Sequence, residues 1–185
     1  MALYTGKGDK GTTKLFTSKN GERISKSDPV FEALGTVDEL NTILGWCRVA
    51  CQVDWLVGEK SASAILLDVQ QHIFTIQAEL AGAEKSIPPE NVEELENRIA
   101  VIEKQLPEIT TFFVPGGSEL SSRLDIARAV SRRAERRLVN LSESGEDISE
   151  HTLVYANRLS SLLYALVRFV NHMNGDEERQ PEYVG

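Results

Sequence analysis

Residues 62–84, ASAILLDVQQHIFTIQAELAGAE, decide the fold class of this chain. Apolar residues recur along this stretch at intervals of three and four, at Ala62, Ile65, Leu66, Val69, Ile73, Ile76 and Leu80. Such spacing places them on one face of an α-helix, which has about 3.6 residues per turn. The stretch therefore predicts an amphipathic helix with one face packed against other helices.

Four further helices are expected from similar signals. Asp28-Pro29 marks the start of a helix that extends to about residue 50, because Asp caps helix N-termini and Pro suits the first helical position. Another helix follows Pro88-Pro89, and its apolar positions alternate in steps of three and four, as in a bundle seam: Val92, Leu95, Ile99, Ile102 and Leu106. The last two are expected over residues 118–142 and 149–174.

No strand pattern of any length and no internal repeat interrupts this series. Five helices with short connections predict an all-α fold, an antiparallel five-helix bundle with ferritin-like up-and-down packing. We expect a single domain over residues 1–185, with an irregular polar arm at 1–27, the bundle at 28–174 and a polar tail at 175–185.

The composition suits one folded domain, because the 185 residues are 41% hydrophobic. The formal net charge is −8, so the chain is a poor general binder of nucleic acid, and a polyanion would need a local cluster of cations. Neither an apolar signal segment nor a bilayer-spanning apolar run is present, which predicts a cytoplasmic protein without a membrane partner.

Cys47 and Cys51 lie one helical turn apart and are interpreted as a reduced structural pair, with a metal or redox role as the alternative.

A glycine- and lysine-rich segment near the start, Thr5-Gly6-Lys7-Gly8-Asp9-Lys10-Gly11-Thr12-Thr13-Lys14, is the first candidate for a binding site. Glycines let several backbone N–H groups point at one anion, and the lysines add charge. The segment lacks the strand, the helix and the ending of a Walker A loop. A solvated terminus and a phosphate cradle both remain open for it.

Clustered arginines on the fourth expected helix form the second candidate: Arg128, Arg132, Arg133, Arg136 and Arg137, with Glu135 among them. At about 100° per residue, Arg128, Arg132, Glu135 and Arg136 fall within roughly one quadrant of the helix. Guanidinium groups bind phosphate through paired donors, so the stripe suits a polyphosphate, and a solvated basic face is the alternative.

Three further positions carry residue types that bundles use sparingly. Asp38 lies one step from apolar positions, where it is either a boundary residue or the buried partner of an arginine. Asn157 sits mid-helix, where asparagine is costly unless it is exposed or hydrogen-bonded. Phe112-Phe113 precedes the turn at Pro115-Gly116-Gly117, and two adjacent aromatic rings cannot easily both enter the core.

These segments, in this order, resemble the PduO-type ATP:corrinoid adenosyltransferases, with a match from Tyr4 to about Arg168. The resemblance implies a homotrimeric five-helix bundle that transfers the 5′-deoxyadenosyl group of ATP to the cobalt of cob(I)alamin, giving adenosylcobalamin and triphosphate. It also implies ATP at subunit interfaces, Mg²⁺ as cofactor and cobalamin as the corrinoid substrate. A reductase and a B12-dependent client enzyme are the further partners that such a reaction implies.

The resemblance assigns roles to particular residues. The nucleotide and its phosphates would be held by Thr5, Gly6, Lys7, Gly8, Thr13, Lys14, Lys26, Arg132, Arg133, Ala134, Glu135, Arg136 and Asn157. Glu135 would help to place Mg²⁺, and Asp38 with Arg128 would form an intersubunit ion pair at the active site. Phe112 would pack beneath the corrin ring, where it excludes water and the lower axial base.

The expected chemistry needs no side-chain nucleophile and no general base, because cobalt(I) itself attacks the 5′-carbon. Cations at the triphosphate lower the barrier as negative charge grows on the leaving group. Arg132, Asp38, Arg128 and Phe112 are therefore the expected catalytic residues. Two rival functions stay open: a non-catalytic ATP-binding helical module, such as a sensor or B12 chaperone, and an ATP hydrolase on the same scaffold.

Overall fold

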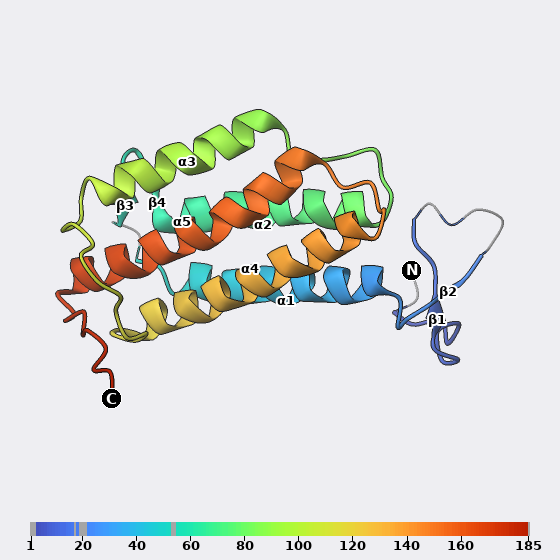
Figure 1. Ribbon diagram of the computed structural model, residues 1–185, viewed down its shortest axis with the longest axis horizontal. Coiled ribbons are helices and arrows are strands. Elements are labelled where there is room, and N and C mark those ends of the chain that lie inside the picture. The colour runs from blue at the N-terminus through green and yellow to red at the C-terminus, as the bar shows by residue number, and fades with distance from the viewer. Residues whose placement is uncertain (1–2, 17, 19–21, 53–54, 185) are drawn as a thin grey trace.

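The computed structural model describes residues 3–16, 18, 22–52 and 55–184. Within these residues the chain forms five helices and two small sheets (Figure 1). The helices are α1 (Pro29–Val49), α2 (Ala62–Leu80), α3 (Pro89–Glu103), α4 (Glu119–Glu143) and α5 (Glu150–Asn174). Parts of the expected arm (1–2, 17 and 19–21) and residue 185 of the expected tail lie outside the described residues, as do residues 53–54.

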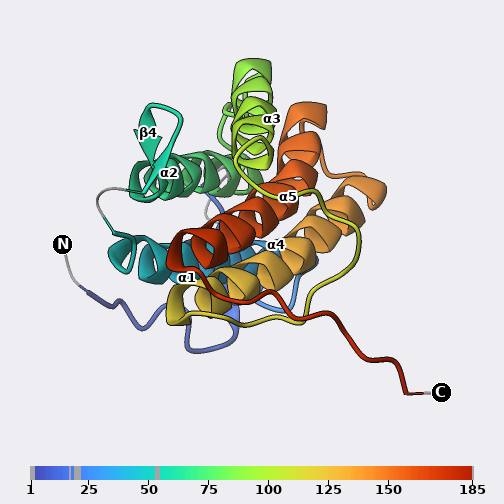
Figure 2. The same cartoon turned by 90° about the vertical axis from the view of Figure 1, so that its left-hand side faces the viewer.

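Four helix pairs build the core. Helix α1 packs against α2 and α4, α4 packs against α5, and α5 packs against α3. The colours of Figure 1 show that successive helices run in opposite directions, and Figure 2 shows α3 at the outer edge of the group. The prediction of five helices is confirmed. None of the described helices is long and apolar enough to cross a membrane.

The apolar face predicted from residues 62–84 is the face that α2 buries: Ala62, Ile65, Leu66, Val69, Ile73, Ile76 and Leu80 are all buried. Helix α3 is less deeply packed, since Val92, Leu95 and Ile102 are buried while Ile99 is only partly covered. Leu106 lies beyond the end of this helix and is partly covered as well. Helix α3 buries fewer of its apolar residues than α2 because it lies at the edge of the group.

Helix α2 ends at Leu80, four residues before the predicted end. Gly82 adopts φ 86°, a left-handed conformation that stops the helix. The Gly82 N–H donates to the carbonyl of Glu79 at 2.8 Å, and the Ala83 N–H donates to the carbonyl of Ala78 at 2.9 Å. This pair of bonds is a Schellman motif, and the alanines around the glycine gave no sign of it in the sequence.

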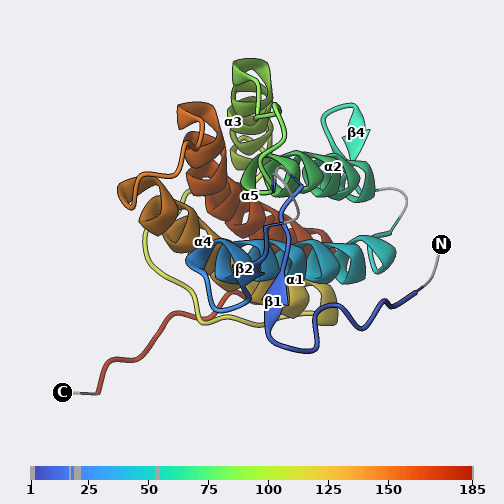
Figure 3. The same ribbon diagram turned by 90° about the vertical axis from the view of Figure 1, so that its right-hand side faces the viewer.

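Two short hairpins correct the expectation that the chain contains no strands. Strand β1 (Thr12–Thr13) pairs with β2 (Ile24–Ser25), and β3 (Leu56–Val57) pairs with β4 (Lys60–Ser61), both antiparallel. Each strand has two residues, which is too short for an alternating pattern to be visible. The first hairpin closes the N-terminal arm beyond the start of α1 (Figure 3).

The coil before α4 is fixed by a helix cap and a glycine. The Ser118 hydroxyl accepts from the Ser121 N–H at 3.1 Å, and the Ser121 hydroxyl accepts from the Ser118 N–H at 2.9 Å, which together form a capping box. Gly117 adopts φ 120°, and a Cβ at that position would lie 2.4 Å from Oδ1 of the buried Asn171. Only glycine fits there.

We expect Gly117→Ala to lower the free energy of unfolding by about 1–3 kcal/mol from backbone strain alone, with a further loss from the overlap with Asn171. Gly116→Ala is the matched control, because Gly116 also has a positive φ (133°) but has open space around it. Urea unfolding of both variants measures the difference. Equal losses would show that the overlap with Asn171 contributes nothing.

Candidate active site

The arginines of α4 fall into two groups. Arg133 forms an ion pair with Glu39, and Arg137 Nη2 lies 3.1 Å from Glu32 Oε1, so these two join α4 to α1. Arg132 and Arg136 are exposed, and their side chains form no hydrogen bond or ion pair with any other residue that the structure describes. They line an open pocket of about 470 Å³ along the second half of α4. These two guanidinium groups are therefore available to an anion.

Glu135 and Asn157, both predicted to bind the nucleotide, lie together. Asn157 Nδ2 donates to Glu135 Oε1 at 2.6 Å, which joins α5 to α4. Arg158 donates to Asn157 Oδ1 at 2.6 Å and to Glu96 Oε1 at 2.8 Å, so the chain of contacts continues to α3. The orientation of Glu135 is thus set by neighbours from two other helices.

Ala134, also predicted to bind the nucleotide, does not face the pocket. Ala134 is buried with 3% exposure, so its side chain belongs to the core. No cluster of three or more metal-ligating side chains exists among the described residues. A metal ion beside Glu135 would therefore take most of its ligands from bound phosphate and water, as Mg²⁺ commonly does.

Arg23 organises the N-terminal arm, although the sequence gave no sign of its role. Its Nε donates to Thr12 Oγ1 at 2.8 Å, and its Nη2 donates to the Lys7 carbonyl at 2.7 Å. Gly6 and Gly11 adopt left-handed backbone conformations, with φ of 66° and 75°, and each allows a turn within the arm. The Lys26 N–H donates to the Gly11 carbonyl at 2.9 Å. The arm is therefore a folded loop closed by its own contacts.

Lys26 and Gly8 meet inside this loop. A Cβ at Gly8 would lie 3.1 Å from Lys26 Nζ, so the absence of a side chain leaves room for the ammonium group beside the backbone. Thr5, Lys7 and Lys14 are exposed around them, and Thr13 lies half-buried in β1. Exposed lysines on a loop with glycine turns fit the requirements of a phosphate cradle.

The arm and the arginine row do not meet within one chain. No hydrogen bond or ion pair links the arm to α4 in the part of the chain that the structure describes. Figures 1 and 3 show the arm beyond the first turn of α1. A single polyphosphate site made from both elements would therefore need the arm of a second copy.

Asp38 and Arg128 are also separate within one chain. Asp38 is exposed on α1 and accepts a bond from Gln77 Nε2 at 3.1 Å. Arg128 Nε donates to Asp125 Oδ1 at 3.0 Å, and its guanidinium carbon lies 5.9 Å from the centre of the Tyr164 ring. Asp125 is 8% exposed and was not singled out from the sequence. Its spacing of three residues from Arg128 was the available signal.

The paired phenylalanines before α4 point to different surroundings. Phe112 is 77% exposed, whereas the ring centre of Phe113 lies 5.3 Å from the guanidinium carbon of Arg168. Phe112 is exposed and Phe113 is half-buried, so the two rings do not both enter the core; that one of them stands in a cleft stays a prediction. An exposed aromatic ring on a surface loop suits contact with a flat apolar ligand.

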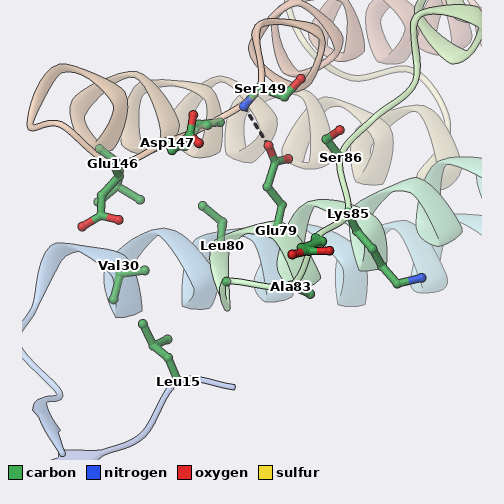
Figure 4. A pocket seen from close by; sticks show the side chains of 14 residues that line it. Leu15, Val30, Glu79, Leu80, Ala83, Lys85, Ser86, Glu146, Asp147 and Ser149 are labelled. Atoms are coloured by element: carbon green, nitrogen blue, oxygen red, sulfur yellow. Dashed lines mark hydrogen bonds between the residues drawn. The ribbon is translucent and has the colours of Figure 1, made fainter. Parts of the chain in front are cut away.

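A larger pocket, of about 580 Å³, lies at the end of the bundle (Figure 4). Acidic side chains contribute much of its lining: Glu79, Glu84, Glu146 and Asp147. Glu79 braces the start of α5, since its carboxylate accepts from the Ser149 N–H at 2.7 Å and from the Thr152 hydroxyl at 2.6 Å. An acidic lining repels polyphosphate, so this pocket is not the candidate site.

Burial favours the neutral forms of two thiols and one histidine in or beside the core. Burial raises the pKa of Cys47 to about 12 and that of Cys51 to about 11, so both free thiols stay protonated. Burial also lowers the pKa of His72, whose Nδ1 lies 2.9 Å from the Tyr155 hydroxyl. These features agree with the interpretation of the cysteines as a reduced structural pair.

Comparison with known proteins places this geometry in a family. The family described as Cobalamin adenosyltransferase matches residues 3–170. The corrinoid adenosyltransferase PduO of Citrobacter freundii is 42% identical over 180 residues, which is 93% of this chain and 50% of that protein. The chain thus spans about half the length of this PduO relative. The corrinoid adenosyltransferase of Bacillus subtilis is 39% identical over 95% of this chain and 89% of its own length.

A solved structure shares the fold across nearly the whole chain. It is a variant of the PduO-type ATP:corrinoid adenosyltransferase of Lactobacillus reuteri, complexed with cobalamin and ATP. The TM-score is 0.89 and the identity 29%, and the alignment covers 98% of this chain and 100% of that one. From the match over residues 3–170, this chain belongs to the cobalamin adenosyltransferase family.

Proposed function

We propose that this chain transfers the 5′-deoxyadenosyl group of ATP to the cobalt of cob(I)alamin, giving adenosylcobalamin and triphosphate. The observation that carries the proposal is the agreement in fold, at a TM-score of 0.89, with a protein solved in complex with both cobalamin and ATP. Family membership over residues 3–170 supports it independently. A non-catalytic ATP-binding module would have no need for the exposed Phe112.

The phosphate end of ATP would bind at Arg132 and Arg136. Their guanidinium groups are unpaired and face an open pocket, so binding an anion requires no existing ion pair to break. Charge grows on the triphosphate as the bond to the 5′-carbon breaks, and cations already in position stabilise that charge without reorganisation. Arg133 would contribute less directly, because Glu39 already holds it.

A second copy of the chain would complete this site. The arm at 1–27 would supply its lysines and backbone amides to the arginine row of a neighbouring bundle, since no hydrogen bond or ion pair joins the described part of the arm to α4. We therefore propose a homotrimer with ATP at the subunit interfaces. The bundle at 28–174 would keep ferritin-like up-and-down packing, and 175–185 would form the tail of the same single domain.

Mg²⁺ would be held at Glu135 together with phosphate oxygens. Mg²⁺ binds proteins through one or two carboxylates and completes its shell with phosphate and water, so a single oriented carboxylate fits this requirement. Asn157 would hold Glu135 in place through their 2.6 Å hydrogen bond and would contact the nucleotide. When bound, the ion would neutralise charge on the phosphate chain.

The corrin ring of the substrate would lie over Phe112. An apolar ring at the lower face of the cobalt excludes water and the dimethylbenzimidazole base, and cobalt(II) without a lower axial ligand is easier to reduce. No described side chain needs to act as a nucleophile, because cobalt(I) supplies the reactivity and the protein supplies orientation. We expect the reaction in the cytoplasm, with a reductase and a B12-dependent client enzyme as partners.

Incubation of the protein with ATP, Mg²⁺ and chemically reduced cobalamin tests the proposal. Adenosylcobalamin and triphosphate should form in equal amounts, and triphosphate should appear only when the corrinoid is present. Phosphate release without the corrinoid would identify a hydrolase instead. ATP binding without turnover of either substrate would identify a sensor or chaperone.

We expect Arg132→Ala to lower kcat/KM for ATP by about ten- to a hundredfold, since a hydrogen bond to a charged group contributes about 1.5–3 kcal/mol. Arg137→Ala is the matched control, because Glu32 already holds that guanidinium. Steady-state kinetics with ATP varied at saturating corrinoid gives the comparison. Normal ATP kinetics in Arg132→Ala would remove this arginine from the phosphate site.

We expect Phe112→Ala to keep ATP binding but to lose most of the activity that starts from cobalt(II), because water or the lower base can then reach the cobalt. Assays with pre-reduced cob(I)alamin should show a much smaller loss. Phe74→Ala serves as the comparison, since that ring is also exposed (59%) but lies on α2, away from the coil before α4. Full cobalt(II)-dependent activity in Phe112→Ala would assign the lower wall of the corrin site to another residue.

We expect Asp38→Asn to impair corrinoid activation or trimer assembly more than ATP binding. Arg128 would be the partner of Asp38 across the interface, and because Asp125 also pairs with Arg128, the loss should lie below the about 3–5 kcal/mol that a fully uncompensated buried charge costs. Sedimentation measures the assembly, and ATP titration measures binding. Wild-type turnover together with a wild-type assembly state would rule out the Asp38–Arg128 pair.

A further inference from the structure

The C-terminal segment at 176–179 returns to the coil that carries the two phenylalanines. The Val114 N–H donates to the Arg179 carbonyl at 2.8 Å, a backbone bond that joins these segments across the end of α5. Both segments line one small pocket, in which residues 114–117 face Asp176, Glu177 and Arg179. Figures 1 and 2 show the segment leaving α5 beside this coil.

A buried guanidinium lies between the two segments. Arg168, on α5, has a side-chain exposure of only 4%. Its Nε lies 3.2 and 3.1 Å from the two carboxylate oxygens of Glu178, and its Nη2 lies 3.1 Å from Glu178 Oε2. On the other side, its guanidinium carbon lies 5.3 Å from the centre of the Phe113 ring. The charge is thus compensated by Glu178 and covered by Phe113.

The same face of α5 holds the far end of the coil. Asn171 lies three residues after Arg168, and its Nδ2 donates to the Gly116 carbonyl at 3.4 Å. The coil is therefore attached to α5 at Phe113 and at Gly116, and to the C-terminal segment at Val114. Phe112 has no such contact of its own, so its direction depends on the backbone that these neighbours fix.

We propose that Arg168 and Glu178 are positioning residues for Phe112, and that residues 176–179 act as a strap that holds the aromatic coil in place. The role rests on the proposed function, in which Phe112 forms the lower wall of the corrin site. Neither Arg168 nor Glu178 touches the corrinoid in this proposal. They act through Phe113 and Val114, and they set the geometry that Phe112 presents to the ring.

The test compares Glu178→Gln with Glu177→Gln in the full chain. The first removes the charge that faces Arg168 and keeps the shape of the side chain. The second makes the same chemical change one residue earlier, on a side chain that is 82% exposed and meets Arg179 only at 3.8 Å, an exposed pair that contributes little to holding the strap. Amide hydrogen exchange over residues 110–117 reports directly on the Val114 N–H.

Glu178→Gln should speed exchange at Val114 by about tenfold or more, because a charge-assisted hydrogen bond is weakened to a neutral one. Glu177→Gln should leave the rate unchanged, and exchange within α1 and α2 should not change in either variant. Unchanged exchange at Val114 in Glu178→Gln would overturn the strap.

Kinetics then separate positioning from general stability. Glu178→Gln should raise the KM for the corrinoid by several-fold while the KM for ATP stays at the wild-type value, since the arginine row is on another face. Faster exchange with unchanged corrinoid kinetics would overturn the positioning role. If the wild-type protein makes no adenosylcobalamin, the proposed function fails, and the exchange experiment still decides whether the strap exists.

Discussion

Burial of the apolar stripe of α4 is the constraint on which the rest of the site depends. Leu124, Ala127 and Leu138 are almost fully buried between α1 and α5, so this helix cannot rotate about its axis. At about 100° per residue, fixing that stripe also fixes the direction of every charged side chain on the helix. Arg133 and Arg137 then face the glutamates of α1. Arg132 and Arg136 are left facing solvent, and they form the proposed anion site of this acidic chain.

Electrostatics give a reason for the separation of the arm from the arginine row, which share no hydrogen bond or ion pair among the described residues. With a formal net charge of −8, the chain neutralises most of its arginines internally, through pairs such as Arg98 with Asp68 and Arg168 with Glu178. Among the described residues, most cations without a carboxylate partner lie in the arm and on one face of α4, with Lys85 and Lys104 among the exceptions. Bringing them together within one chain would create repulsion without a ligand to balance it. Assembly around a polyphosphate removes that cost, which favours a nucleotide site between subunits.

The helices could be predicted from sequence because each has a long apolar period, and the predicted start of α1 at Asp28-Pro29 agrees with the structure. What could not be predicted depends on short segments or on contacts between distant residues. The end of α2 rests on the backbone of Gly82, and the hairpins have two residues per strand. That Arg133 is paired while Arg132 is exposed follows from the position of Glu39 on α1, which the sequence does not give. The role of Arg23 likewise depends on how the arm folds around it.

In the proposed reaction, orientation by the protein would supply most of the catalytic effect, because the substrate's cobalt would act as the nucleophile. The thiols of the core remain protonated, and partial burial lowers the pKa of the half-buried His72. If the substrate's cobalt supplies the nucleophile, a shift of the corrin ring relative to the nucleotide affects the rate as strongly as loss of a direct contact. Residues that never meet the substrate then become functionally important. Gly117 allows Asn171 to approach the aromatic coil, and the strap secures the coil's other side.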